Sequence, residues 1–571
     1  MTLFLGACGG GAAAPAGSPA APSGSPSSAA DAAFSKLADD YFDAGDHYSP
    51  TGAVNNGFHA YDAQIEDRSR ARIEQRIGEL HGFLDRLTKL DRAALSFDNA
   101  LDIQAIEGEI RSELLTLDTL KLWAKNPMTY AGLPGGAIDA LMKRDFAPKK
   151  DRLRSLIARL RGVPAIFAAG KANVADPPRE FTDVALGRAK GTAGFLEGSV
   201  ATWARDAAGG DAALLAELEA ANKAAIAASR EFATWLQNDL LPRSKGSFVL
   251  GEARFLEKLK YDEMVEMPLA ELLARGEANL KKDHDDFVAT AKKIDPSKTA
   301  AQVMATLGDQ HPTADDLIPA VRRSLEAARQ FVIDKDLVTI PSDVRPRVEP
   351  TPPYARGTGF ASMDTPGPFE TRATEAFYYI EPVEPDWDAK HKDEHLRLFN
   401  LPVVGLINIH EAFPGHYVQF LYSPRFPTKT RKLVGAGSNA EGWAHYAEQM
   451  MVDQGFGGGD PKIRLAQLSE ALVRDCRYVV GVKLHTKGMT VEEGAKLFVD
   501  QCFQEPAVAY VEARRGTFNP TYLYYTLGKL QIQELAAEYM KKKGATLKQF
   551  HDAFVGQGAL PIPLVRQILL R

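Results

Sequence analysis

The sequence predicts a mainly α-helical protein with a small β element in its second half. Apolar residues recur at helical spacing along most of the 571 positions, which places them on one face of successive helices. β-like texture is confined to about residues 333–385, and no segment repeats at a fixed period. Together these three observations favour one large helical domain over residues 31–571.

Two amphipathic helices are predicted near the start of this domain. Their apolar stripes consist of Ile73, Ile77, Leu80, Leu84 and Leu87 in the first helix and Ile103, Ile106, Ile110, Leu114 and Leu117 in the second. Further helices are expected near residues 149–161, 211–240, 267–293, 315–332 and 463–483. Stripes of this kind usually pack the core, so none of them is assigned a function.

The β element is predicted from two short runs. Residues 337–340 (Leu-Val-Thr-Ile) and 376–380 (Ala-Phe-Tyr-Tyr-Ile) are rich in β-branched and aromatic residues. Turns rich in Pro and Gly separate them, as expected between short strands. A small sheet inserted before the chemical motif fits this pattern.

The N-terminus has the texture of an exported protein. Residues 1–7 are apolar or small, and residues 5–8 (Leu-Gly-Ala-Cys) resemble the end of a truncated bacterial lipoprotein signal, with Cys8 as the lipidated residue. Residues 9–30 are almost only Gly, Ala, Pro and Ser, which is typical of a flexible tether. The alternative is a chance cysteine in an apolar start. We predict a periplasmic or outer-membrane lipoprotein of the cell envelope that contacts a membrane only through an anchor at Cys8, because no later segment has about 18 uninterrupted apolar residues.

Charge and cysteine content exclude several classes of function. The formal net charge of −6, without a long Lys/Arg block, gives no electrostatic case for binding nucleic acid. An exported protein could join Cys476 to Cys502, but two cysteines outside a C-x-x-C pair fall short of a disulfide framework, and no bond is predicted.

The densest cluster of chemically capable residues lies within segment 403–450, the predicted metal site. Residues 410–416 read His-Glu-Ala-Phe-Pro-Gly-His. The common zinc peptidase motif, H-E-x-x-H, places two histidines on one helical face beside a glutamate that activates water. This chain instead has H-E-x-x-x-x-H, with Pro414 where the second histidine would stand.

The longer spacing requires a broken helix. Six residues of unbroken helix advance about 600°, so His416 would point roughly 120° away from His410. Pro414 cannot donate to the carbonyl of His410, and Gly415 permits an irregular backbone. We therefore expect an interruption here that turns both imidazoles towards one metal ion.

A third ligand is expected at Glu441. Mixed His and carboxylate ligands are typical of zinc sites. The alternative is structural, because Ser438 and Glu441 also have the spacing of a helix capping box. His445 and Glu448 lie one and two turns further along the same face and could orient a ligand, and His445 is the substitute ligand if His416 faces away.

The two motifs, 410–416 and Glu-Gly-Trp-Ala at 441–444, resemble the paired signatures of the bacterial domain-of-unknown-function 885 family. That family is similar to helical zinc peptidases of the angiotensin-converting-enzyme and oligopeptidase kind, whose third ligand lies about this far downstream. The resemblance implies a large helical clamshell with a deep cleft. It extends through Arg477, His485 and residues 520–528, where this chain departs from the family pattern at Thr521 and is one residue shorter.

These comparisons of residues predict a zinc-dependent hydrolase that cleaves short peptides. His410, His416 and Glu441 would hold Zn²⁺, and Glu411 would act as the general base. By resemblance, Tyr525, or Tyr524 as the alternative, would stabilise the oxyanion, with His485 as a possible partner or else a structural histidine.

Two other functions stay open at this stage. The same site could serve an amidase or esterase acting on non-peptide substrates, or the chain could be a peptide-binding lipoprotein without catalysis. Glu411 speaks against the second, since a binding site needs no base beside a metal ligand.

Overall fold

The computed structural model describes residues 28–352, 355–356 and 359–571. The first helix, α1 (Ala29–Tyr48), begins where the hydroxyl of Ser28 accepts a hydrogen bond from the Asp31 amide. The predicted tether therefore ends slightly too late, because residues 29 and 30 are already helical. Cys8, the predicted signal and the tether up to residue 27 lie outside the described residues.

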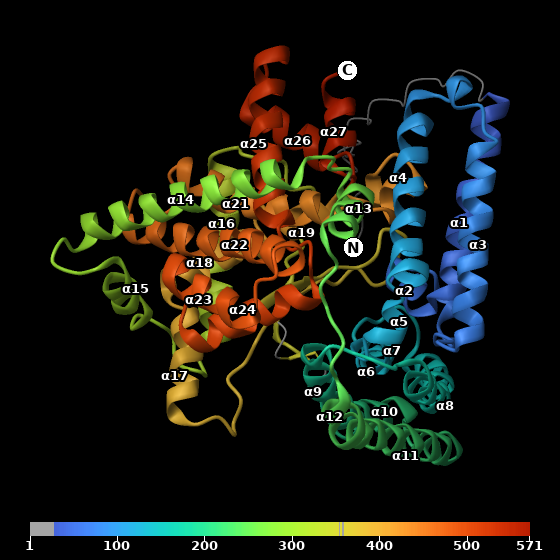
Figure 1. The fold of residues 1–571 in the computed structure, drawn as a ribbon. Helices are drawn as coiled ribbons and strands as arrows, with labels where there is room; N and C mark the ends of the chain where they lie inside the picture. The colour runs from blue at the N-terminus through green and yellow to red at the C-terminus, as the bar shows by residue number, and fades with distance from the viewer. Residues whose placement is uncertain (1–27, 353–354, 357–358) are drawn as a thin grey trace, which may run out of the picture.

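The helices with the two predicted stripes stand side by side at the right of Figure 1. This part comprises α1, α2 (Pro50–Asn56), η1 (His59–Tyr61), α3 (Arg70–Thr88), η2 (Arg92–Ala94), α4 (Phe97–Leu114) and the π-helical turn η3 (Leu115–Thr119). All five stripe residues of α3 pack into one core, three of them fully buried. The burial of apolar area on one face is what stabilises such a helix, and both stripe predictions are confirmed.

A second group of helices has a core of its own, below the first in Figure 1. The short helix α5 (Leu122–Lys125), whose Trp123 packs against the first core, leads into this group. The group comprises α6 (Met128–Ala131), α7 (Leu133–Met142), α8 (Lys149–Asn173), α9 (Arg179–Phe195), η4 (Leu196–Val200), α10 (Ala201–Ala208), α11 (Ala212–Trp235), η5 (Leu236–Leu240) and α12 (Leu241–Arg243). The helices expected near 149–161 and 211–240 are α8 and α11 with η5, both longer or differently bounded than predicted.

The middle of the chain leads from helices into the small sheet. Its elements are α13 (Glu252–Glu263), α14 (Leu269–Ile294), α15 (Ala300–Gly308), α16 (Leu317–Asp334), β1 (Arg347–Pro350), β2 (Ala361–Asp364), β3 (Phe377–Ile380) and α17 (Ala389–Leu398). β3 is central, parallel to β1 and antiparallel to β2. The sheet precedes the metal motif, as predicted.

One of the two strand predictions is wrong. Residues 337–340 form no strand, although Leu337 and Val338 are buried. Their backbone groups bond to side chains of α26 (Leu547–Val555): the carbonyl of Leu337 meets the His551 imidazole at 2.7 Å, and the Thr339 amide donates to Asp552 at 2.7 Å. These contacts satisfy the backbone without a neighbouring strand.

The C-terminal third carries the predicted site. It comprises α18 (Leu401–Glu411), α19 (His416–Leu421), η7 (Ser423–Arg425), α20 (Lys429–Leu433), α21 (Gly437–Asp453), α22 (Pro461–Thr486), α23 (Val491–Cys502), α24 (Pro506–Phe518), α25 (Tyr524–Lys543), α26 and α27 (Ile562–Leu569). The protein is thus mainly α-helical with one small sheet, as predicted. The clamshell shape and deep cleft stay predictions.

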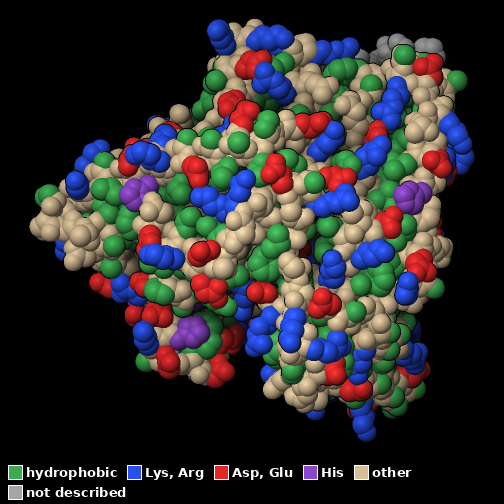
Figure 2. All heavy atoms as spheres, in the orientation of Figure 1, with side chains coloured by type: hydrophobic (Ala, Val, Ile, Leu, Met, Phe, Trp, Pro, Cys, Tyr) green, Lys and Arg blue, Asp and Glu red, His purple; other side chains and the backbone are tan. Residues whose placement is uncertain are grey.

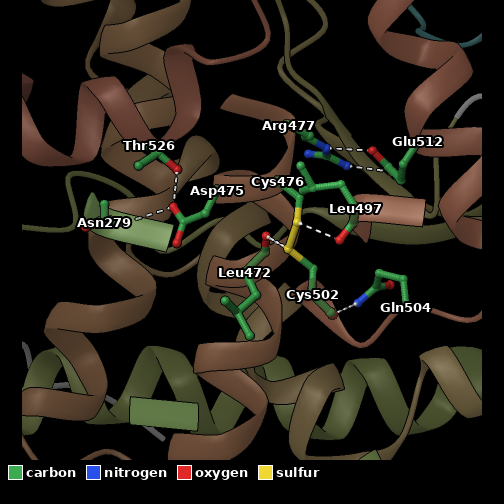
Figure 3. Close-up of a disulfide and its surroundings, with 10 residues drawn as sticks. All are labelled: Asn279, Leu472, Asp475, Cys476, Arg477, Leu497, Cys502, Gln504, Glu512 and Thr526. Atoms are coloured by element: carbon green, nitrogen blue, oxygen red, sulfur yellow. Dashed lines mark hydrogen bonds and ion pairs between the residues drawn. A yellow bond between two sulfur atoms is a disulfide. The ribbon is translucent and has the colours of Figure 1, made fainter. Parts of the chain in front are cut away.

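A disulfide joins Cys476 of α22 to Cys502 of α23, beside Arg477 (Figure 3). The prediction of no bond is therefore wrong. α22 and α23 pack against each other and bring the two Cα atoms to 6.5 Å, within the usual range for disulfides. The two cysteines are 26 residues apart and belong to no cysteine motif, so the sequence alone could not predict that they pair.

Replacing both cysteines with serine is expected to lower the free energy of unfolding by about 3 kcal/mol, because the bond restricts the unfolded chain over a loop of this length. Denaturant titration of the oxidised protein and of the double variant measures the difference. Reductant should move the midpoint of the wild-type protein and leave that of the variant in place. Two freely alkylated thiols in the unreduced, denatured protein would contradict the bond.

Acidic and basic side chains are interspersed over the face shown in Figure 2, which has no broad block of one sign. Across the part of the chain that the structure describes, no helix has the length and apolar content to span a bilayer.

Candidate metal centre

The helix that carries the first histidine ends within the motif. α18 ends at Glu411, and α19 begins at His416. Between them the Gly415 amide donates to the carbonyl of Ile409 at 2.9 Å, and a Cβ on residue 415 would collide with the carbonyl oxygen of His410. Only glycine fits this close approach. The predicted interruption is confirmed.

The interruption brings the two imidazoles and Glu441 together. The Nε2 atoms of His410 and His416 lie 3.4 and 3.2 Å from Oε2 of Glu441, and the ring centroids are 4.9 Å apart. One nitrogen from each histidine and one carboxylate oxygen lie within 4.8 Å of one another. Ligand atoms 2.0–2.1 Å from a tetrahedral zinc ion stand roughly 3.4 Å apart, so these three side chains fit zinc.

The structure does not use Glu441 as a helix cap. α21 is preceded by Ala436 as its N-cap residue, without a side-chain cap. The Ser438 amide donates instead to the buried carboxylate of Glu263 at 2.9 Å. Glu441 is therefore available to the cluster, and the capping-box alternative is wrong.

Glu448 holds His410 in place from behind. Its Oε1 lies 2.6 Å from Nδ1 of His410, so that Nε2 faces Glu441. Burial lowers the pKa of His410, but the hydrogen bonds to Glu441 and Glu448 outweigh burial and raise that pKa to about 10. Carboxylates that favour a proton on an imidazole also favour a metal cation beside it.

His445 lies behind the cluster rather than within it. Its side chain is fully buried, and its Nδ1 is 3.4 Å from Oε2 of Glu448. The three groups that converge are His410, His416 and Glu441, so His416 and not His445 occupies the second histidine position.

Glu411 is positioned as a base should be. Its side chain borders the same cavity of about 490 Å³ as the three candidate ligands, and its Oε2 has no hydrogen-bond partner among the described residues. Burial raises the pKa of Glu411, and the nearby His410 and His416 partly oppose that rise. A carboxylate with a raised pKa can both accept and return a proton.

The structure separates the two tyrosine candidates. Tyr525 borders the metal cavity, its ring 6.5 Å from that of His410, and its hydroxyl accepts a hydrogen bond from Arg515 at 3.1 Å. Tyr524 borders a second cavity of about 800 Å³, and its hydroxyl accepts from Asn519 at 2.9 Å. Tyr525 is thus the tyrosine beside the cluster.

Two glycines place Tyr525 there. A Cβ on Gly442 of α21 would meet the backbone of Gly528 of α25 at 2.6 Å. The two helices therefore touch along their backbones one residue beyond Glu441, and α25 carries Tyr525 up to the cluster.

The fold and geometry can now be compared with known proteins. Residues 50–569 match the family described as "Bacterial protein of unknown function (DUF885)". The chain belongs to the DUF885 family. No curated protein matches it.

Solved structures share the fold of this DUF885 protein. A candidate lipoprotein of unknown function from Shewanella oneidensis is 27% identical, with a TM-score of 0.77 over 94% of this chain and 100% of that one. A candidate lipoprotein from Colwellia psychrerythraea is 17% identical, with a TM-score of 0.77 over 94% of this chain and 98% of that one. The second likeness shows the fold alone.

His485 is not brought to the cluster. It is fully buried, its Nε2 bonds to the carbonyl of Gly516 at 2.9 Å, and it borders the larger cavity with Tyr524. The two cavities are neighbours, because Phe420, Ala440 and Glu441 line both. The DUF885 resemblance at His485 therefore marks a residue of the neighbouring cavity.

Arg477, through which the family resemblance extends, donates two hydrogen bonds to Glu512, at 2.7 and 2.8 Å. Two further cavity arginines carried no signal in the sequence, and the first of them, Arg474, pairs with Glu470. Arg515 joins them from α24. Packing of α22 against α24 assembles this arginine wall, and no spacing rule links residues on two such helices.

Glu448→Gln is expected to weaken zinc binding by about 10- to 100-fold, because the amide orients His410 without stabilising the metal-bound state by charge. Competition with a chromogenic chelator measures the dissociation constant. The matched control is Glu534→Gln, which removes an exposed carboxylate that pairs with Arg275, and this variant should bind zinc as the wild type does. Unchanged affinity in Glu448→Gln would show that Glu448 has no part in holding the ligand.

Proposed function

We propose that this DUF885 protein is a zinc-dependent hydrolase that cleaves peptide bonds in short peptides of the cell envelope. The observation that carries the proposal is the meeting of His410, His416 and Glu441 at ligand distances, with Glu411 in the same cavity. A binding site would need the ligands but not the adjacent base.

The chemistry divides between the metal and the chain. Zinc, when bound, supplies Lewis acidity that polarises a scissile carbonyl and lowers the pKa of water. Glu411 takes a proton from water while the oxygen of that water bonds to the carbonyl carbon. Glu411 then delivers this proton to the leaving nitrogen as the C–N bond breaks. The second proton of the water leaves the new carboxylic acid for the amine, so the products are a carboxylate and an ammonium group.

Tyr525 is placed to stabilise the oxyanion. Its hydroxyl accepts from Arg515, which leaves the hydroxyl hydrogen for another acceptor, and the side chain borders the cavity that also contains His410. A donor aimed at developing negative charge lowers the barrier. Burial raises the pKa of Tyr525, so the hydroxyl keeps its hydrogen at neutral pH.

The proposed location is the cell envelope, through a lipid on Cys8. The lipobox-like start and the Gly, Ala, Pro and Ser tether support it, as does the lipoprotein description of the relative from Shewanella oneidensis.

Removal of the metal is expected to abolish peptide hydrolysis, and one equivalent of zinc per chain to restore it, because the three ligands and the base act only together. The measurement is mass spectrometry of a mixed peptide library after incubation with native, chelator-treated and zinc-restored protein. Parallel ester and non-peptide amide libraries test the broader hydrolase alternative. Zinc-loaded protein that cleaves none of these would contradict the proposal and leave only binding.

A further inference from the structure

The metal cavity contains three arginines, and two of them are neutralised within the protein. Arg477 forms a double hydrogen bond with Glu512. Arg474 pairs with Glu470 and lies 3.5 Å from Glu448. Buried guanidinium groups are paired in this way because an uncompensated buried charge is costly.

Arg515 differs from both. Among residues 28–352, 355–356 and 359–571, no carboxylate oxygen lies within 4 Å of its guanidinium. Within the same residues, its one side-chain hydrogen bond is the donation to Tyr525 at 3.1 Å. The side chain is half-buried and borders the cavity that also contains His410 and Glu411. Among the described residues the guanidinium thus has no carboxylate of its own, since the nearby Glu512 is hydrogen-bonded to Arg477.

A planar guanidinium beside a catalytic cavity suits a planar carboxylate, which it binds through two parallel hydrogen bonds. A peptide has one carboxylate in a fixed place, at its C-terminus. We propose that Arg515 binds the α-carboxylate of peptide substrates, so that the protein acts as a carboxypeptidase on short peptides. This inference rests on the proposed function.

The arrangement of the two cavities fits that direction of binding. The smaller cavity, about 490 Å³, contains Arg515, and the larger, about 800 Å³, lies on the other side of Glu441. Both cavities share Phe420, Ala440 and Glu441, so the proposal has an extended peptide run past Glu441 from one cavity to the other. Its carboxyl end then lies near Arg515, and the remaining residues occupy the larger cavity.

The test uses one mixed-sequence library of short peptides in two forms, with free C-terminal carboxylates and with carboxamides. The wild-type protein should hydrolyse the acids with a kcat/KM about 10- to 100-fold higher than the amides, the usual value of a hydrogen-bonded charge pair. Arg515→Met should remove this preference by slowing the acids more than the amides, which it slows only through the lost hydrogen bond to Tyr525. Arg515→Lys, which keeps the positive charge but not the two parallel N–H donors, should retain part of the preference for acids.

A matched control is available on the same helix. Arg514→Met removes the neighbouring guanidinium, which borders neither cavity, and should leave the preference unchanged. If Arg515→Met slows acids and amides equally, Arg515 merely positions Tyr525 and the carboxylate proposal is wrong. Equal hydrolysis of both forms by the wild type would overturn it as well.

Binding separates this proposal from the catalytic one. Zinc-loaded Glu411→Gln protein should retain the acids over the amides on an affinity column, and the Glu411→Gln/Arg515→Met protein should not. If the wild-type protein hydrolyses nothing but the Glu411→Gln protein still prefers the acids, the hydrolase proposal is wrong and the carboxylate site stands. If the wild-type protein hydrolyses peptides but neither rate nor binding distinguishes acids from amides, the carboxylate proposal is wrong and the hydrolase proposal stands.

Discussion

Glu411→Gln is expected to lower kcat/KM for peptide hydrolysis by about 10²- to 10⁴-fold while the protein keeps its zinc. The glutamine has nearly the same shape but cannot accept a proton from water. Glu411 is not among the three converging ligand groups, so its loss should leave their geometry intact. Zinc content by atomic emission and hydrolysis of the peptide library, measured on the same preparation, check both parts of the prediction.

The matched control is Glu505→Gln, which removes an exposed carboxylate at the start of α24 without touching the cavity. It should hydrolyse peptides at the wild-type rate. Equal zinc with wild-type hydrolysis in Glu411→Gln would remove Glu411 from the mechanism. Loss of zinc in that variant would instead show that Glu411 helps to hold the metal.

The core of the site could be predicted from the sequence because its cause is local. Pro414 cannot donate a backbone hydrogen bond, and Gly415 is the one residue type that fits against the carbonyl of His410. The missing donor of Pro414 and the conformational freedom of Gly415 follow from residue type, so an interruption that turns His416 towards His410 could be expected before any coordinates, whereas the close approach of Gly415 to that carbonyl could not.

Glu441 is a harder case, because its local pattern with Ser438 favours a helix cap and only the nearby His410 and Glu411 favour a metal ligand. The structure resolves the choice through Glu263, which lies 178 positions before Glu441 in the chain and takes the Ser438 amide for itself. A competition between one near and one distant partner is not visible in a local pattern.

The strand expected at 337–340 failed for a similar reason. Its apolar residues are buried as a strand's would be, but its backbone groups bond to His551 and Asp552, more than 200 positions away. β-propensity describes a fit to a half-buried surface, and a helix can supply that surface as well as a sheet.

The position of Arg515 and the disulfide could not be predicted from sequence spacing. Each depends on how α22 packs against a neighbouring helix, α24 in one case and α23 in the other. Helix stripes predict that such packing exists, but ridges and grooves decide which side chains then meet.

His416→Ala is expected to weaken zinc binding by more than about 100-fold, beyond the usual cost of losing a residue that merely orients a ligand. The substitution leaves one imidazole and one carboxylate, too few for a stable zinc site in water. His445→Ala should change the affinity by less than about tenfold, because His445 is outside the group of three ligands and its hydrogen bond is to Glu448. The pair of variants therefore separates the two histidines by the same measurement, zinc affinity by chelator competition.

Folding must be controlled, since His445 is fully buried and an alanine there leaves a void. His445→Asn, which keeps a polar group near Glu448, is the second variant, and thermal unfolding of each zinc-free protein reports its stability. Zinc retained by folded His416→Ala but lost from folded His445→Asn would make His445 the ligand and the observed pairing of His416 with Glu441 incidental. The opposite result would show that the break between α18 and α19 serves to bring His416 to the metal site, since a continuous α18 would turn His416 away from Glu441.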